Sequence, residues 1–533
     1  MGIWRKIKSK LKRDSRLENY IEFSLRKLPR SNPGNHKISL IELGTNFTGT
    51  IAVSYFTRIW LSGGQKLIGF RPYINNKFLP KILDHLFSRL SIDNGLDYPF
   101  RLARAIGINE FLFPKKFWKD SISVKKCLET FTSIEREALL LKEVEGIRVG
   151  DLFYDWHLRK RGLATVDSST TNFMADLTEF LHNFYFWNRI LNQTKYENII
   201  ISHTVYMQGI LVRLGLARGI NVYLVSFDRV YRLNEQLVHS DIEFKLYDPN
   251  KSVQFGYRID LERAHKKLAL MGSDINLAFG IPGLVSGLHG AVDKNLIKQT
   301  QKLKVLIAPH CFSDSPHAMG DFLFCDYFEW LNFICELSME LDYDWYIKPH
   351  PGFLESDKYH FKLLLERFPN LKLIDENVSN LGLFKNGIDV VITAQGTIGF
   401  EAAAFGILAI NASADAPASR YNFTFSPKTI SELRSALFDL KKIKAGFKIN
   451  RNEILHFYDL HYLRRTNSWL FKDKGSLFFD KFEKYSEIFL SPKVFDIWIN
   501  HVYSPTQDKN RIDEVKKFLG KTEYQLNTDM ETP

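Results

Sequence analysis

The chain has 533 residues, of which 45% are hydrophobic and 14% aromatic, including 43 phenylalanines. This length exceeds what one hydrophobic core usually serves, so two domains are expected, and the composition excludes a disordered chain. No apolar run is long enough for a membrane-spanning helix. The four cysteines show no metal-ligand spacing, which is typical of a reduced, intracellular protein without zinc.

The formal net charge of +12 is concentrated at the amino terminus, where residues 1–30 hold ten Lys/Arg and three acidic residues. A nucleic-acid-binding domain would spread a basic face over its fold, so nucleic acid is not an expected partner. The first turns place four apolar side chains on one helical stripe among basic residues: Ile3, Trp4, Ile7 and Leu11. We therefore expect residues 1–30 to bind an anionic membrane surface from the cytoplasmic side. The alternative is a solvated helix that packs on the protein's own body.

The first half of the chain alternates buried strands with helices. The expected strands are 37–43, 66–70, 198–202 and 221–226, and the expected helices are 50–61 and 206–218. Strand, glycine-bearing loop and helix in series predict a parallel sheet covered on both faces.

A Gly-, Ala- and Ser-rich stretch around 273–298 is the expected junction to a second series of the same kind. Its expected strands are 304–308, 345–348, 371–374, 389–393 and 408–411, and its expected helices are 322–339, 357–368 and 397–405. The predicted organisation is thus α/β, with one Rossmann-like domain over 31–295, a second Rossmann-like domain over 296–445, and outer helices over 446–533. Ligands are expected in a central cleft where the carboxyl ends of the strands of both domains face each other.

The strongest local motif is Lys348-Pro349-His350-Pro351-Gly352, directly after a predicted strand. A His between two prolines has an extended, restricted backbone. It can bind a phosphate oxygen or protonate a leaving phosphate. The alternative is a surface turn in which the His caps a neighbouring helix.

A second motif runs from Thr393 to Ala402, with sequence TAQGTIGFEA. A glycine-bearing turn that opens a helix presents free backbone N–H groups to a phosphate. Candidate ligands here are Thr393, Gln395, Gly396, Thr397 and Glu401, the last as an acceptor for a ribose hydroxyl. The alternative is an ordinary strand-to-helix turn whose glycines permit close packing.

Together the K-P-H-P and T-x-x-G-T-x-G-x-E-A motifs resemble the carboxyl-terminal domain of bacterial capsule and surface-polysaccharide glycosyltransferases. These include enzymes that use CMP-activated sialic acid or Kdo and, more distantly, CDP-glycerol polymerases. The resemblance covers residues 304–412 and implies a GT-B fold, phosphate binding by His350, Thr393 and Thr397, and no DxD metal site. The chain departs from that group at Gln395 and Gly396, where paired serines are common.

A donor site without metal must neutralise phosphate with cationic side chains and helix ends, and Lys348 and His350 fit that need. The DxD-like string Asp342-Tyr343-Asp344 precedes its strand, so we interpret it as a solvated turn. No cofactor beyond the nucleotide-sugar substrate is expected, and no metal.

Candidates for the catalytic base or acceptor contact come from several loops. Asp151 and Asp155 are four residues apart and share one face if helical, although Asp151 could also be a helix cap. His203 follows a predicted strand, and Glu42 and Asp228 are positional candidates. His310 follows the first predicted strand of the second domain and is a candidate contact to the phosphate or sugar of the donor. The alternative is a His–backbone bond that stabilises the loop.

The leading hypothesis is a glycosyltransferase that moves an acidic sugar from a CMP-linked donor to a surface polysaccharide or lipid-linked acceptor. Alternatives are a CDP-polyol-phosphate transferase, a sugar-nucleotide epimerase, or a non-catalytic scaffold of a capsule assembly complex.

Overall fold

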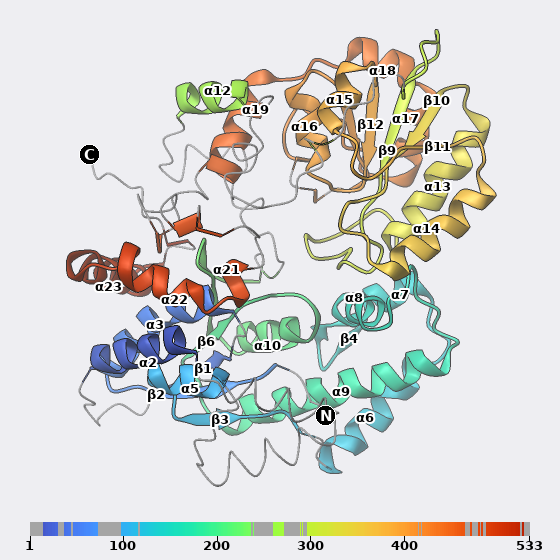
Figure 1. Ribbon diagram of the computed structural model, residues 1–533. Coiled ribbons are helices and arrows are strands. Elements are labelled where there is room, and N and C mark those ends of the chain that lie inside the picture. Colours follow the sequence, from blue (N-terminus) through green and yellow to red (C-terminus); the bar gives the residue numbers. More distant parts are fainter. Residues whose placement is uncertain are drawn as a thin grey trace, which may run out of the picture. The chain divides into compact units, whose positions relative to one another are not determined.

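The computed structural model describes residues 14–29, 37–43, 46–72, 98–115, 118–235, 238, 260–270, 288, 290, 296–413, 415–416, 418–463, 469–471, 478–479, 481–482, 487–522 and 525–526. The chain divides into two compact units (Figure 1). Unit 1 consists of Met1–Thr132, Leu177–Val238 and Arg465–Pro533, and unit 2 of Ser133–Asp176 and His239–Arg464.

Unit 1 contains a six-stranded sheet in the order β3-β2-β1-β6-β7-β8. All neighbours pair in parallel except β8, which is antiparallel to β7. The strands are β1 Ile38–Glu42, β2 Lys66–Phe70, β3 Glu110–Leu112, β6 Asn198–Ile201, β7 Asn221–Val225 and β8 Val230–Arg232. Strands added on one side of β1 and then on the other make the β1/β6 boundary the switch point of a doubly wound sheet.

Helices cover this sheet because its strands are apolar on both faces. The helices that lie wholly in unit 1 include α2 Ser15–Lys27, α3 Phe47–Ser62, α5 Tyr98–Ala105, α6 Trp118–Glu129, α10 Tyr206–Leu216, α22 Lys493–Ile497 and α23 Pro505–Leu519. They are joined by the short helix α21 Glu487–Leu490 and the π-helix η6 Trp498–Val502, and α9 Thr171–Gln193 runs from unit 2 into unit 1. Side chains of α2, α3, α5, α22, η6 and α23 share one core with β1, β2, β6 and β7.

Unit 2 contains a five-stranded, fully parallel sheet in the order β11-β10-β9-β12-β13. Its strands are β9 Lys304–Ala308, β10 Asp344–Ile347, β11 Lys372–Leu373, β12 Val390–Thr393 and β13 Leu408–Asn411. The switch point is the β9/β12 boundary. A separate hairpin pairs β4 Glu143–Val144 with β5 Ile147–Arg148.

Two cores lie on the two faces of this sheet, since alternate residues of a strand point to opposite sides. Val305 and Ile307 join the core beneath α13 Tyr327–Glu340, α14 Glu355–Arg367 and α17 Ile430–Phe438. Leu306 and Ala308 join the core beneath α15 Asn380–Lys385, α16 Ile398–Ala404, α12 Leu261–Leu270 and α19 Arg451–Tyr458. The remaining elements are α7 Arg136–Leu140, α8 Gly150–Arg161, α18 Leu440–Gly446 and the π-helix η3 Asp459–Leu463. The two predicted Rossmann-like domains are confirmed by strand order and pairing; their predicted facing arrangement stays a prediction.

The predicted domain boundaries need correction, because both units are built from separated segments. Residues 133–176, predicted in the first domain, belong to unit 2. The carboxyl-terminal segment is no outer extension, since Phe495 and Trp498 are fully buried in the core of unit 1. The predicted junction at 273–298 lies largely outside the described residues.

The predicted membrane segment also divides into two parts. The apolar stripe from Ile3 to Leu11 lies outside the described residues. Residues 15–27 form α2, which buries Leu17, Tyr20 and Ile21, and the Tyr20 ring stacks on Phe495 with centroids 4.0 Å apart. The second half of segment 1–30 therefore belongs to the folded unit, as the alternative interpretation had it.

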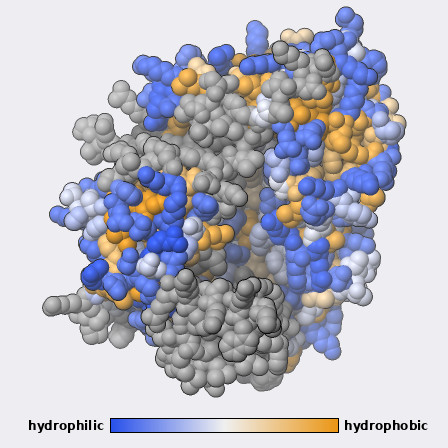
Figure 2. Space-filling model, in the orientation of Figure 1, coloured by the Kyte–Doolittle hydropathy of each residue, from blue (hydrophilic) through white to orange (hydrophobic). Residues whose placement is uncertain are grey.

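No helix in the described part of the chain combines the length and apolar character that crossing a membrane requires. Figure 2 shows the view of Figure 1 coloured by hydropathy, with hydrophilic residues over much of the described surface and apolar ones between them. Such a mixture is ordinary for a protein surface.

Candidate functional site

Three loops of unit 2 meet at the carboxyl ends of adjacent parallel strands. β9 is followed by His310, β10 by His350, and β12 by the turn from Ala394 to Thr397. Because β9 lies between β10 and β12, the loops are neighbours at one edge of the sheet. In open α/β sheets, a switch point such as the one between β9 and β12 leaves a crevice in which ligands bind.

His310 lies at the centre of these loops. Its ring stacks on Tyr327, with centroids 4.8 Å apart, and lies nearly parallel to His350 at 6.0 Å. Burial, with the charge of His350 adding to it, lowers the pKa of His310 to about 3, so the ring is neutral at physiological pH. Its Nε2 is buried and has no hydrogen-bond partner, although buried polar atoms are normally satisfied.

Gly396 permits the close approach of the third loop to His310. A Cβ at this position would lie 2.8 Å from Thr393 Oγ1 and 3.2 Å from His310 Nε2. Any side chain would therefore enter the space next to the unpartnered nitrogen. The unsatisfied imidazole and the missing Cβ together mark a small polar recess.

The ring of His350 has a defined orientation. The backbone N–H of Gly352 donates to Nδ1 at 3.0 Å, so a neutral ring carries its proton on Nε2. Nδ1 also lies 3.4 Å from Cys311 Sγ. Burial, followed by the charges of Asp357 and Asp314, raises the pKa of Cys311 to about 12, which argues against a nucleophilic thiolate.

The hydroxyl ligands predicted at the third loop differ in availability. Thr397 is exposed at the start of α16, although its hydroxyl also hydrogen-bonds the Glu401 carboxylate. Thr393 is fully buried, where its Oγ1 donates to Ala308 O at 3.0 Å and accepts from the Gly396 N–H at 3.3 Å. Thr393 therefore shapes the loop, and the direct phosphate contact predicted for it would require these bonds to break.

Two predicted ligands are committed to a buried network. Lys348 Nζ donates to Asn380 Oδ1 at 2.6 Å, and the Asn380 amide donates to Glu401 Oε2 at 3.0 Å. Burial lowers the pKa of Lys348 to about 8 and raises the pKa of Glu401. In this arrangement both side chains stabilise the packing of α15 and α16 on the sheet, and the contacts of Lys348 with phosphate and of Glu401 with ribose stay predictions.

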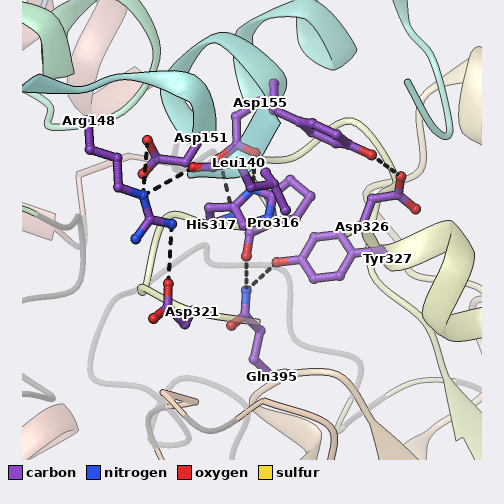
Figure 3. Close-up of polar contacts among 11 residues, drawn as sticks. Leu140, Arg148, Asp151, Asp155, Pro316, His317, Asp321, Asp326, Tyr327 and Gln395 are labelled. Atoms are coloured by element: carbon purple, nitrogen blue, oxygen red, sulfur yellow. Dashed lines mark hydrogen bonds and ion pairs between the residues drawn. The ribbon is translucent and has the colours of Figure 1, made fainter. Parts of the chain in front are cut away.

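Asp151 and Asp155 are both on α8 and buried, as their spacing predicted, but α8 belongs to unit 2. Asp155 Oδ1 accepts from His317 Nδ1 at 2.6 Å, and Oδ2 accepts from the backbone N–H of His317 at 3.2 Å (Figure 3). Asp151 lies 4.0 Å from Arg148 Nε and is in the first turn of α8 rather than at its N-cap, Val149. With both oxygens occupied, Asp155 is not a free base.

The residues predicted in the first domain gather at the switch point of unit 1. Glu42 ends β1 and accepts from both the backbone N–H and the hydroxyl of Ser202, after β6, at 2.6 and 2.8 Å. Burial outweighs these bonds and raises the pKa of Glu42. His203 is exposed beside them, and Asp228 accepts from Ser226 at 2.7 Å. Because His203 is in unit 1, its predicted role together with the loops of unit 2 stays a prediction.

A pocket of about 650 Å³, including the open solvent at its mouth, lies beside Glu42. Its polar lining comes from Glu42, Asn46, Thr50, Ser202 and Ser226, and its walls are apolar. Such a mixture of apolar walls with a few convergent polar groups is typical of small-molecule sites.

One group of described residues has potential metal-ligand geometry: the ligand atoms of Glu137, Cys325 and Glu329 lie within 4.8 Å of one another. The guanidinium of Arg136 already lies 3.6 Å from the Glu329 carboxylate. Cys325 lies at the far end of the loop after β9, directly before Asp326, the N-cap of α13, and metal independence stays a prediction.

Two residues of the site, His317 and Tyr327, were not predicted from the sequence. The available signal was position: His317 follows Pro316 in the loop after β9 that also carries His310. Neither residue type nor spacing could reveal that α8 supplies its partner.

No protein-family model matches the chain, and no curated protein sequence does. Among solved structures, the chain is similar to MurG from Acinetobacter baumannii, with 11% identity and a TM-score of 0.25 over 80% of this chain and 96% of that one. A glycosyltransferase from Rickettsia africae has 12% identity and a TM-score of 0.26, over 92% of this chain and 100% of that one. A Methanocaldococcus jannaschii UDP-GlcNAc 2-epimerase, in complex with UDP-GlcNAc and UDP, has 11% identity and a TM-score of 0.26, over 79% of this chain and 97% of that one. Likeness this low carries no conclusion about activity, so the fold is assigned from strand order and pairing.

Proposed function

We propose that this protein is a nucleotide-sugar-dependent glycosyltransferase that binds the donor phosphate at the three loops of unit 2. The observation that carries the proposal is the buried, unpartnered His310 Nε2 beside Gly396, at the switch point of a parallel sheet. An anionic oxygen in this recess would satisfy the nitrogen, and His350 Nε2 supplies a further donor. The exposed Thr397 hydroxyl would add another by turning away from Glu401. Preorganised donors of this kind stabilise the charge that develops on a leaving phosphate.

The proposed acceptor site is the Glu42 pocket of unit 1. In the reaction, the acceptor hydroxyl oxygen attacks the anomeric carbon, the bond from that carbon to the donor phosphate breaks, and the nucleotide leaves with the electron pair. Glu42 takes the hydroxyl proton, since its raised pKa brings a carboxylate nearer to the operating pH. The proposal includes the GT-B arrangement, in which both units serve one reaction.

For the finer assignment, we favour a CMP-linked acidic sugar as donor and a surface polysaccharide or lipid-linked glycan as acceptor. Both rest on the motif resemblance of residues 304–412. Residues 1–13, rich in basic and apolar side chains, are the proposed membrane-binding part, at the cytoplasmic face.

The first test measures nucleotide release from CMP-, CDP- and UDP-linked donors by the purified protein, with and without His350→Ala. We expect release from one donor class and a loss on the order of 10²-fold in the variant, because one preorganised donor to the leaving group disappears. His360→Ala, a histidine on α14, is the matched control. Release of a polyol phosphate would favour the CDP-polyol alternative, and epimerised donor would favour an epimerase. No turnover and no nucleotide binding would favour a scaffold, and full activity of His350→Ala would remove this imidazole from the mechanism.

A further inference from the structure

Two neighbouring residues of α8, Tyr154 and Asp155, bind the segments that contact the side-chain amide of Gln395 in the third loop. Asp155 binds the ring and the backbone N–H of His317 through its two carboxylate oxygens. The preceding residue, Tyr154, donates its hydroxyl to Asp326 Oδ2 at 2.6 Å. Asp326 is fully buried and caps α13, accepting from the Glu329 N–H at 2.8 Å.

The segments bound by Asp155 and by Tyr154 both contact the side-chain amide of Gln395 (Figure 3). Pro316, next to His317, presents its carbonyl oxygen 3.4 Å from Gln395 Nε2. The same amide also donates to the hydroxyl of Tyr327, the residue after Asp326. The ring of Tyr327 in turn stacks on His310. Gln395 is buried, so its orientation depends on these two partners.

We propose that the Asp155–His317 pair is a positioning device for the phosphate-binding loops: it acts through Pro316 and Gln395 to hold the turn at Gly396 against His310. This inference rests on the proposed function only for the nature of the ligand. His317 and Asp155 are positioning residues, because they act through Gln395.

The charges around His317 keep the pair intact. Burial alone would lower the pKa of His317, but the charge and hydrogen bond of Asp155 outweigh it, with Asp151 and Asp326 adding to the rise. The Tyr154 ring meets His317 edge-on at 5.5 Å, and Arg148 balances Asp151 and Asp321 from the outside. The raised pKa favours the protonated ring, whose hydrogen bond to Asp155 is then charge-assisted, although burial also raises the pKa of Asp155.

A second buried Asp–His pair provides a matched control. His157 of α8 lies 2.8 Å from Asp176 through its Nδ1, and both residues are buried. None of the contacts described for Gln395 involves this pair. Loss of either imidazole removes a buried hydrogen-bond partner of a carboxylate, but only loss of His317 should affect the third loop.

The first readout is amide hydrogen exchange at Gly396 and Gly399, whose N–H groups bond to Thr393 Oγ1 and Gly396 O. His317→Ala should accelerate exchange there by about tenfold relative to His157→Ala. This measurement needs no ligand, so it decides the inference even if the protein binds no nucleotide. Unchanged exchange in His317→Ala, or equal acceleration in both variants, would overturn it.

The second readout is a double-mutant cycle on CMP and UDP affinity. His317→Ala should weaken binding by about tenfold in the wild-type background and add little to Gln395→Ala, because both act through one contact. Additive losses would show that His317 has a merely structural effect and would overturn the proposal. If His317→Ala does not fold, Asp155→Asn replaces it. The imidazole ¹⁵N signals of His317 should then titrate at lower pH than in the wild type, with faster exchange at Gly396, and a wild-type-like result would refute the inference.

Discussion

At the scale of single residues, unit 2 holds two buried imidazoles whose pKa values shift in opposite directions. His310 is kept neutral because burial is not compensated by any carboxylate, and its pKa falls to about 3. The pKa of His317, which is equally buried, is raised because Asp155 lies 2.6 Å away. A neutral imidazole can enter a phosphate site as a donor without first losing a counter-ion. His310 and His317 are buried to the same extent, and the carboxylate partner of His317 is what distinguishes this positioning residue from His310, the candidate ligand.

Glu42 is the residue of unit 1 that tests the acceptor half of the mechanism. Glu42→Gln keeps an oxygen that can accept both bonds from Ser202, but it cannot take a proton. We expect kcat to fall by roughly 10²- to 10⁴-fold, the usual contribution of a general base, with little change in donor affinity.

The pH profile gives an independent check on Glu42. Because the pKa of Glu42 is raised, the activity of the wild type should fall on the acidic side at a pH above the usual carboxylate range, as the pH drops through this pKa and the carboxylate is protonated. This fall in activity is the acidic limb of the pH profile. Glu42→Gln should lack this limb, whereas Ser202→Ala should keep it and shift it upward, because the hydroxyl of Ser202 donates one of the bonds that stabilise the carboxylate. If the pH profile of Glu42→Gln still shows the wild-type acidic limb, another group is the base.

At the scale of elements, the loop between β12 and α16 requires glycine at position 396, although the backbone angle φ there is not positive. Gly396 is absent from the described positions with positive φ, so its requirement is space. The recess it leaves has Thr393 and His310 as its walls.

Gly396→Ala should therefore reduce ligand binding more than stability. The new Cβ would meet Thr393 Oγ1 at 2.8 Å and His310 Nε2 at 3.2 Å, so both side chains must shift and the methyl group occupies the recess. We expect CMP or UDP affinity to fall at least about tenfold, a cost typical of overpacking by one methyl group. Gly446→Ala, where a Cβ meets nothing within 4 Å, is the control and should bind normally. Equal affinity in both variants would mean that the ligand does not approach Gly396.

At the scale of the whole molecule, each unit borrows segments that are distant in sequence. Unit 1 closes its core with residues after 465, and Arg58 of α3 makes a bidentate pair with Asp508 of α23 at 2.8 and 2.9 Å. The α8 region, between two parts of unit 1, belongs to unit 2. Neither unit is therefore a contiguous fragment that could be expressed by cutting the chain once.

Amino-terminal truncations should separate folding from membrane binding. Deletion of residues 1–13 removes basic residues ahead of α2 and should release the protein from anionic vesicles without changing its Tm. Deletion of residues 1–28 also removes the buried Leu17, Tyr20 and Ile21, and should lower stability by several kcal/mol, since each large core side chain contributes about 2–5 kcal/mol. Vesicle co-sedimentation and thermal unfolding measure the two effects. Undiminished vesicle binding by the shorter deletion would place the membrane contact elsewhere.

The sequence by itself determined the central strands of both sheets, several of their helices and the loops that follow those strands, whereas β3, β8, α6 and the long helix α9 were not predicted. β2, β9 and β13 were predicted to the residue, because apolar periodicity and glycine-bearing turns act within a few neighbours. It also located His310, His350 and Gly396 at one sheet edge, since parallel strands bring their carboxyl ends together.

Only the tertiary structure decided which core each segment joins and which partner each polar side chain finds. Lys348 follows Ile347 on the strand path, and the alternation of side chains puts it on the face of Tyr346, toward α15 and α16. The partners of Asp155, Glu42 and Lys348 are at least 32 residues away along the chain. Local patterns carry no information on such pairings, because they arise from packing between segments that meet only when the sheets and their helices have assembled.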